Sequence, residues 1–316
     1  MQCVLVGNYG VGNIGDEALR EYFLSEFPEI EWVCVSASPK GEHEVPRLPL
    51  GLRSLVAPWW RTISAIRSAD ALIFGGGSLF TDVESVWACL LWRSYASLAT
   101  LFGTPYMLAF QGAGPWKTAL GRRLARKTYL HASFISVRDA ESLQRVRGLG
   151  EVKDPVLTFD PAFALFAKYP KTPVTNRTLI ISPRANSSEQ FFASVSDRLK
   201  TKWDAVRVLL MEPQEERGVA DRLRTMIPSC SVVEITSVSQ LLMEIGGATE
   251  AVVQRFHGAL AALALDVPFE IVPQAPKDKM AALSEAVKSA GAREEWLVFV
   301  SKGAEELRSA LQKLHP

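Results

Sequence analysis

The chain contains 316 residues, of which 48% are hydrophobic and 22% are charged, and its formal net charge at pH 7 is +1. This composition is typical of a globular protein with room for two domains of about 150 residues each. The near-neutral charge excludes a general nucleic-acid partner, and four cysteines without metal-ligand spacing exclude a zinc site or a disulfide framework.

Neither a secretory signal nor a membrane-spanning segment is predicted. The first residues pass directly into an apolar strand pattern without a basic region. The longest apolar segment, residues 86–110, is interrupted by Arg93 and Pro105. The sequence therefore predicts a cytoplasmic protein.

Predicted strands alternate with predicted helices through the first half of the chain. The strands are short apolar runs, and the helices are longer amphipathic segments. Strands are expected at residues 3–6, 32–35, 71–74, 106–110 and 134–137. Helices are expected at residues 16–27, 61–68, 83–102, 116–131 and 139–146. Residues 40–60 are rich in Pro, Gly and charged residues, which predicts irregular structure.

Three of these strands open onto glycine-rich loops. The loops are GNYGVGNIGDEAL at residues 7–19, GGGS at residues 75–78 and QGAG at residues 111–114. Because the carboxyl ends of parallel strands share one edge of a sheet, three such loops together predict a ligand surface.

The first loop also matches the G-x-G-x-x-G dinucleotide fingerprint through Gly10, Gly12 and Gly15. In that fingerprint the first glycine closely follows the strand, whereas Asn8 and Tyr9 intervene here. No acidic residue ends the second strand to hold a ribose. We therefore expect no dinucleotide cofactor.

The alternation of strands and helices restarts after a polar, proline-containing stretch, of which residues 169–176 are the expected linker. Strands are expected at residues 178–182, 205–211, 230–235, 251–254 and 267–272. Helices are expected at residues 189–203, 215–226, 240–245, 258–265, 279–290 and 304–314. We predict an α/β protein with two Rossmann-like, doubly wound domains, residues 1–168 and 177–316, that face a central cleft.

Arg255 and His257 occupy the turn between the strand at 251–254 and the helix at 258–265. A helix N-terminus offers unpaired N–H groups, and an arginine adds a donor fork that matches a carboxylate or phosphate. Imidazole can move a proton near neutral pH. The turn therefore predicts an anion site with an acid–base group, although capping or core roles would place the same two residues there.

Seven motifs together resemble the polysaccharide pyruvyl transferases. The motifs are GNYGVGNIGDEAL at 7–19, GGGSLFTD at 75–82, QGAGP at 111–115, SVRDAES at 136–142, FDPAFAL at 159–165, ISPR at 181–184 and RFHGALAALALDVPF at 255–269. The family resembles two-domain GT-B glycosyltransferases in architecture. The chain departs from the family pattern at Val253 and Gln254, where the family tends to have Gly-Met. It departs again at Gln274 and Ala275, where the family has Tyr-Asp before Pro-Lys.

The resemblance implies transfer of the pyruvate unit of phosphoenolpyruvate to a sugar of a cell-surface polysaccharide, with release of phosphate. Phosphoenolpyruvate is then a co-substrate, and neither a cofactor nor a metal is expected. Three cations, Arg184, Arg255 and Lys277, are expected to bind this donor, because its several negative charges need fixed cations. His257 is the expected general acid.

The acceptor sugar, free or lipid-linked, is expected at the glycine-rich loops of the first domain through Asn13, Asp16 and Asp82. For Asp16 and Asp82 the alternative is a purely structural role at the start of a helix.

Two other functions remain open. One is a nucleotide-sugar glycosyltransferase or epimerase of the same fold, which would need polar groups that hold a ribose in the second domain. The other is a non-catalytic sugar-binding protein, which would not need His257 beside Arg255.

The helix at 116–131 suggests a peripheral membrane contact at the inner face of the membrane. Its cations and aromatic residues are Trp116, Lys117, Arg122, Arg123, Arg126, Lys127 and Tyr129. Clustered cations favour an anionic membrane surface, and aromatic residues favour its interface. An ordinary solvated helix explains the same charges, and a homo-oligomer is compatible with the sequence.

Overall fold

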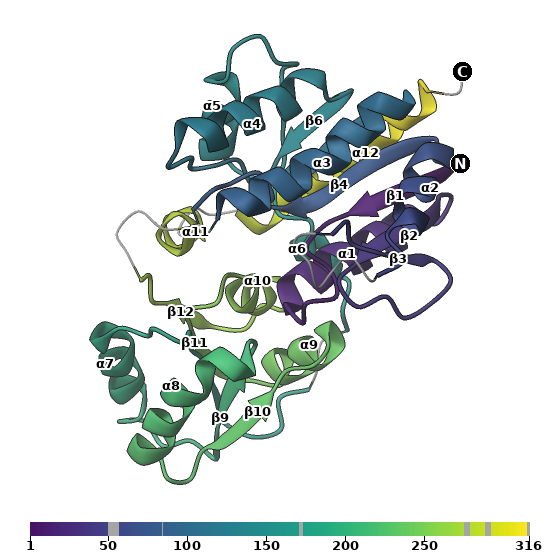
Figure 1. The fold of residues 1–316 in the computed structure, drawn as a ribbon. Helices are drawn as coiled ribbons and strands as arrows, with labels where there is room; N and C mark the ends of the chain where they lie inside the picture. Colours follow the sequence, from purple (N-terminus) through teal and green to yellow (C-terminus); the bar gives the residue numbers. More distant parts are fainter. Residues whose placement is uncertain (50–56, 84, 171–172, 275–278, 288–291, 315–316) are drawn as a thin grey trace. The chain divides into compact units, whose positions relative to one another are not determined.

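The computed structural model describes residues 1–49, 57–83, 85–170, 173–274, 279–287 and 292–314 (Figure 1). The chain forms two compact units. The N-terminal unit comprises Met1–Val11, Leu19–Pro161 and Trp296–Pro316, and the C-terminal unit comprises Gly12–Ala18 and Ala162–Glu295. The two units differ from the expected domains at three segments. Residues 12–18 and 162–168 group with the C-terminal unit, and residues 296–316 group with the N-terminal unit.

A seven-stranded parallel sheet forms the centre of the N-terminal unit, in the order β3-β2-β1-β4-β5-β6-β7. Its strands are β1 Gln2–Val6, β2 Glu31–Ser36, β3 Glu44–Pro46, β4 Ala71–Gly77, β5 Tyr106–Gln111, β6 Phe134–Val137 and β7 Val156–Leu157. The middle strands are continuous apolar runs, as is usual for a sheet with both faces covered. In register, Val4 of β1 pairs with Val33 of β2 and Leu72 of β4.

Helices cover this sheet and begin where side chains cap them. They are α2 Trp60–Ser68, α3 Val86–Phe102, α4 Ala119–His131, α5 Ala140–Arg147 and most of α1 Ile14–Glu26 and α12 Ala292–Gln312. Ser85 accepts from the Trp87 backbone N–H, and Thr118 accepts from that of Gly121. Because these residues satisfy N–H groups of the first turn, α3 and α4 begin three residues later than expected.

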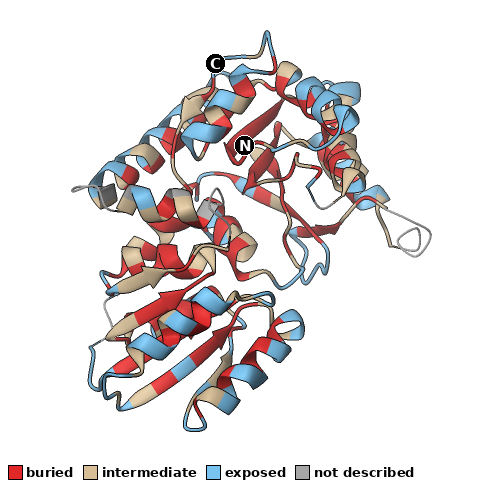
Figure 2. Cartoon of the chain, turned by 90° about the vertical axis from the view of Figure 1, so that its left-hand side faces the viewer, coloured by how far each residue is buried: buried red, intermediate tan, exposed pale blue. Residues whose placement is uncertain are grey.

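The C-terminal unit contains a five-stranded parallel sheet in the order β10-β9-β8-β11-β12. Its strands are β8 Thr178–Ser182, β9 Ala205–Leu210, β10 Ser231–Glu234, β11 Glu250–Val253 and β12 Phe269–Ile271. Its helices are α6 Ala162–Ala167, α7 Glu189–Arg198, α8 Pro213–Met226, α9 Val238–Gly246, α10 Phe256–Ala264 and α11 Lys279–Val287. Figure 2 shows buried residues along the strands and exposed residues on the outer helix faces.

The predicted α/β class and its doubly wound topology are confirmed. Three elements were not predicted, namely β3, β7 and α6, and each is at most six residues long, which is too short for a clear periodic pattern. None of the described helices is long and apolar enough to cross a membrane.

The expected aromatic face of the 116–131 helix is wrong. Tyr129 is fully buried, and Trp116 packs against the core while its Nε1 donates to the Phe80 carbonyl at 2.7 Å. Of the cations, Arg122 and Arg126 donate to the carbonyls of residues 148 and 149. Tyr129 is thus on the inward face of α4 and Trp116 precedes the helix, and the membrane contact itself stays a prediction.

Asp82 holds the segment that leads into α4. Its carboxylate accepts from the backbone N–H groups of Lys117 at 2.6 Å and Thr118 at 2.8 Å, and from Thr118 Oγ1 at 2.6 Å. Burial by itself would raise the pKa of Asp82, but these hydrogen bonds outweigh it and hold the pKa below its ordinary value. The ionised carboxylate therefore stabilises the folded state.

We expect Asp82→Ala to lower the free energy of unfolding at neutral pH by about 1–3 kcal/mol, because the backbone N–H groups of Lys117 and Thr118 lose their charged acceptor. Since the folded pKa is lowered, this stabilisation is present above the unfolded pKa and is lost as pH falls through the folded pKa. Urea denaturation at a series of pH values measures both effects. Asp154→Ala, which removes an exposed ion pair with Arg147, is the control and should have much less effect.

Candidate functional site

The candidate site lies at the point where the strand order of the second sheet reverses. Strands β8 and β11 are neighbours in the sheet but are separated in the chain, and their connections lead to opposite sides. Val253 pairs with Ser182, and the Gln254 N–H donates to the Ser182 carbonyl at 2.8 Å. Open α/β sheets bind ligands outside the carboxyl ends of strands at such a point. Arg184 and Arg255 both follow these two strands directly.

Helix α10 begins at this point. Arg255 is its N-cap residue, with an extended backbone and no side-chain bond to the helix N–H groups. Such an N-terminus attracts anions through its N–H groups and its partial positive charge. Gly258 allows the helix to start close to β8, because a Cβ at this position would lie 3.2 Å from Ser182 Oγ.

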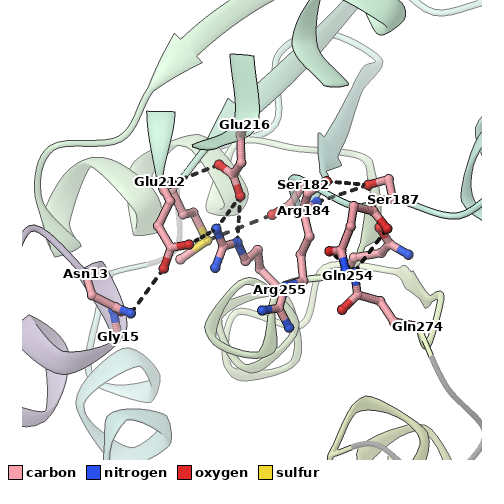
Figure 3. Close-up of polar contacts among 12 residues, drawn as sticks. Asn13, Gly15, Ser182, Arg184, Ser187, Glu212, Glu216, Gln254, Arg255 and Gln274 are labelled. Atoms are coloured by element: carbon pink, nitrogen blue, oxygen red, sulfur yellow. Dashed lines mark hydrogen bonds and ion pairs between the residues drawn. The ribbon is translucent and has the colours of Figure 1, made fainter. Parts of the chain in front are cut away.

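Arg255 is held by two carboxylates (Figure 3). Its Nε donates to Glu216 Oε1 at 2.7 Å, and its Nη2 donates to Glu212 Oε2 at 2.6 Å and also to Glu216. Glu216 is fully buried, and its Oε2 accepts from the Glu212 backbone N–H at 2.9 Å. Burial disfavours the charged guanidinium, but the two glutamates outweigh it and raise the pKa of Arg255. Arg255 therefore stays charged and its orientation is fixed.

The two acids also change what Arg255 can offer an anion. Nε and Nη2 are engaged, whereas Nη1 makes no hydrogen bond within the described residues. With both carboxylates ionised, the group of Arg255, Glu212 and Glu216 carries a net charge of −1. Attraction of an anion must therefore come chiefly from other groups.

Arg184 is a second cation at the same sheet edge. It lies two residues beyond β8 and is partly exposed, and its guanidinium has no hydrogen-bond or ion-pair partner in the described part of the chain. Its backbone is held by Ser187, whose Oγ accepts from the Arg184 N–H at 3.1 Å. The third predicted cation, Lys277, lies outside the described residues.

His257 lies in the first turn of α10, with its ring at right angles to Phe256 and 5.4 Å from it. The imidazole also faces the first turn of α1, which belongs to the same unit. A Cβ at Gly15 would be 2.0 Å from His257 Nδ1, so only glycine leaves room for the ring. The last glycine of the fingerprint-like loop therefore accommodates this imidazole.

Asn13 caps α1 and contacts Glu212. Its Oδ1 accepts from the N–H groups of Gly15 at 2.9 Å and Asp16 at 3.4 Å, and its Nδ2 donates to Glu212 Oε1 at 3.3 Å. Asn13, rather than Asp16, is thus the cap, and Asp16 lies within the first turn. The structure connects Asn13 through Glu212 to Arg255 (Figure 3).

Asp82 differs from these residues because it belongs to the N-terminal unit, where both its oxygens are engaged by the segment before α4. The glycines of the neighbouring loops also serve packing. A Cβ at Gly7 would lie 2.3 Å from the buried ring of Tyr9, and a Cβ at Gly75 would lie 2.5 Å from the Tyr9 hydroxyl oxygen. This hydroxyl donates to the Gly75 carbonyl at 2.8 Å. Tyr9 therefore fills the space that these two glycines leave open.

Four residues of the site were not predicted, namely Ser187, Glu212, Glu216 and Gln254. A signal existed for Glu212, because it follows a predicted strand and so reaches the same edge as Arg184. For Glu216 the sequence shows only a polar residue in a helix. No group of three or more His, Cys, Asp or Glu that could hold a metal occurs within the described ranges.

A family model described as polysaccharide pyruvyl transferase matches residues 13–272, well over half of the chain. No curated protein matches the sequence significantly. The matched range contains Asn13, Arg184, Arg255 and His257.

Three solved structures show the same fold. S. aureus MnaA in a co-structure with UDP is 10% identical, with a TM-score of 0.58 over 95% of this chain and 94% of that chain. The UDP-GlcNAc 2-epimerase from Neisseria meningitidis bound to UDP-GlcNAc is 11% identical, with a TM-score of 0.54 over 99% of this chain and 100% of that chain. Anabaena HepE in complex with UDP and glucose is 8% identical, with a TM-score of 0.53 over 99% of this chain and 98% of that chain. At these identities the likeness concerns the fold alone, a GT-B-like pair of Rossmann-like domains.

The contact of Gly15 with His257 generates a first prediction for the site. Gly15→Ala places a methyl group where the imidazole lies, so we expect the ring to move and the free energy of unfolding to fall by about 1–3 kcal/mol. Urea denaturation measures the loss, and the imidazole resonances of His257 report the movement. Gly218→Ala is the control, because nothing lies within 4 Å of the position that the added Cβ would take and because alanine favours a helix more than glycine does. Unchanged His257 resonances in Gly15→Ala would contradict the assigned contact.

The buried ion pair generates a second prediction. Arg255→Met leaves the buried Glu216 without its cation, and we expect a loss of about 3–5 kcal/mol in the free energy of unfolding. The double variant Arg255→Met, Glu216→Leu should recover part of this loss, because it removes both charges. Arg222→Met removes an exposed arginine paired with Glu189 and should have much less effect. Equal stability of the single and double variants, measured by urea denaturation, would show that the pair is not coupled.

Proposed function

The chain belongs to the polysaccharide pyruvyl transferase family, and on this premise we propose that it transfers the pyruvate unit of phosphoenolpyruvate to a sugar. The acceptor is a sugar of a cell-surface polysaccharide or of its lipid-linked precursor, and phosphate is released. The observation that carries the proposal is the position of Arg184, whose guanidinium is unpartnered within the described residues, beside the helix start that holds Arg255 and His257.

Donor binding rests on complementary charge. Phosphoenolpyruvate is a compact anion with a carboxylate and a phosphate, and each matches a guanidinium fork or helix N–H groups. Arg184 offers its whole fork, whereas Arg255 offers Nη1 and is oriented by Glu212 and Glu216. In the proposal Lys277, which lies outside the described residues, adds a third cation.

His257 acts as the general acid in the proposed reaction. The imidazolium gives its proton to the methylene carbon of phosphoenolpyruvate, which leaves a cation-like centre at the neighbouring carbon. A sugar hydroxyl forms a C–O bond to that carbon and returns a proton to the His257 imidazole. A second hydroxyl of the same sugar then displaces the phosphate, which leaves with that hydroxyl's proton as the C–O bond to phosphate breaks and the ketal closes. A bound anion favours the charged imidazolium that the first step requires.

Acceptor binding is proposed for Asn13 and Asp16, which lie at the start of α1 in the same unit as His257. The Asn13 amide already contacts Glu212, so the two residues offer polar groups next to the Arg255 network. For Asp82 the hydrogen bonds to the segment before α4 favour the structural role.

The alternative is a nucleotide-sugar glycosyltransferase or epimerase of the same fold. Such an enzyme needs free polar groups to hold a ribose in the second domain. Glu212 and Glu216 are the acids in the right region, but both of them hold Arg255. This engagement favours phosphoenolpyruvate over a nucleotide sugar as the donor.

Phosphate release from phosphoenolpyruvate, with and without candidate sugar acceptors, tests the proposal. We expect release that depends on an acceptor. His257→Ala should reduce turnover by about 10²- to 10⁴-fold with donor binding retained, because an acid acts in the transition state. Arg184→Ala should weaken donor binding by about 10- to 100-fold, as expected for loss of a charged hydrogen bond.

Matched controls are the exposed residues His43 and Arg217, whose alanine variants should behave as the wild type. Near-normal turnover in His257→Ala would return this histidine to a structural role. Acceptor-dependent turnover with a nucleotide sugar, and none with phosphoenolpyruvate, would establish the alternative function instead.

A further inference from the structure

Gln254 is a fully buried glutamine at the carboxyl end of β11. Its backbone N–H bonds to β8, so the residue lies at the point where the strand order reverses. Its side-chain Oε1 accepts from Ser187 Oγ at 2.6 Å (Figure 3). The Nε2 group has no hydrogen-bond partner within the part of the chain that the structure describes.

Ser187 determines which end of the carboxamide carries the oxygen. Its hydroxyl has one hydrogen and two acceptors in reach, Gln254 Oε1 at 2.6 Å and the Arg184 carbonyl at 2.8 Å. The contact with Gln254 Oε1 is the shorter of the two, so the hydroxyl is assigned as a donor to Gln254, and the two N–H bonds of Nε2 point away from Ser187.

A buried N–H without an acceptor is unfavourable, and folded proteins rarely leave one. Besides the carboxylates of Glu212 and Glu216, which Arg255 engages, the groups that share this sheet edge with Gln254 are donors. They are the Arg184 guanidinium, Arg255 Nη1 and the N-terminus of α10. A bound anion is the ligand that all of these donors have in common. An amide adds two further donors to such a site without adding charge.

We propose that Gln254 is a direct ligand of the donor anion and that its Nε2 donates a hydrogen bond to a phosphate or carboxylate oxygen held by Arg184. The identity of this anion as phosphoenolpyruvate rests on the proposed function. Ser187 fixes the carboxamide and the backbone of Arg184 together, so the amide donor and the base of the Arg184 side chain keep a constant separation. The pair thereby selects the geometry of the bound anion as well as its charge.

A purely structural role makes a different prediction for the same residue. If Gln254 only supports the loop of Arg184, an acceptor for the Ser187 hydroxyl is all that is needed. Gln254→Glu keeps that acceptor with the same shape but replaces the donor by an oxygen. The variant therefore keeps the hydrogen bond that a structural role needs and removes the donor that a ligand of an anion needs.

The experiment is calorimetric binding of phosphoenolpyruvate, together with steady-state kinetics. We expect binding to weaken by about 10- to 100-fold in Gln254→Glu and by about tenfold in Gln254→Met. The KM for phosphoenolpyruvate should rise accordingly, with the KM for the acceptor unchanged. Gln240→Glu is the matched control, because it adds the same charge in the same unit while keeping the acceptor for Thr236. Its affinity should remain that of the wild type.

Wild-type affinity in Gln254→Glu overturns the inference. If melting shows that this variant does not fold, Gln254→Met decides, and unchanged affinity in it overturns the inference equally. Inorganic phosphate as a second probe separates the inference from the proposed function. Saturable phosphate binding that depends on Gln254, without binding of phosphoenolpyruvate, would reject the proposed function and retain the anion ligand. Absence of wild-type binding to both probes would reject the two together.

Discussion

The ion pair of Arg255 with the buried Glu216 is the interaction on which the carboxyl edge of the second sheet depends. A carboxylate without solvent contact is stable only beside a compensating cation. Arg255 provides that charge at the residue where β11 passes into α10. The same bonds join the start of α8 to the start of α10. They therefore fix the direction in which the side chain of His257, two residues after Arg255, projects from α10.

Because of this pairing, Arg184 and Arg255 differ in charge balance and in mobility, although the sequence presents both as cations of the same kind. Arg255 is fixed and its charge is more than balanced, whereas the Arg184 fork is unpartnered in the described residues. A fixed arginine loses little side-chain entropy on binding and presents one edge with a set direction. An arginine without a carboxylate partner supplies net positive charge. In the proposed anion site the two arginines together combine orientation with attraction, which neither could supply alone.

Glycines that look alike in the sequence have different physical tasks. Gly7 and Gly75 leave room for the ring of Tyr9, and Gly15 leaves room for the imidazole of His257. In each case a Cβ would come too close to an aromatic ring, so the glycine is required by packing. The resemblance of this loop to a dinucleotide fingerprint arises because close approach needs glycine, whether the approaching group is a pyrophosphate or a side chain.

The sequence alone predicts the alternation of strands and helices and with it the α/β class and the two sheets, because the elements follow from hydrophobic periodicity. It also predicts that Arg184, Arg255 and His257 follow strands, and parallel topology brings such strand ends to one edge. The sequence did not predict that Glu216 is buried against Arg255, that Asn13 rather than Asp16 caps α1, that Tyr129 points inward or that Gln254 lies beside Ser187. Glu216 and Arg255 are 39 positions apart and Ser187 and Gln254 are 67 positions apart, and the other two differences are choices of cap residue and of helix face. Local patterns carry no information about such partners. Only the packing of the sheets and helices decides which side chains meet and which donors remain for a ligand.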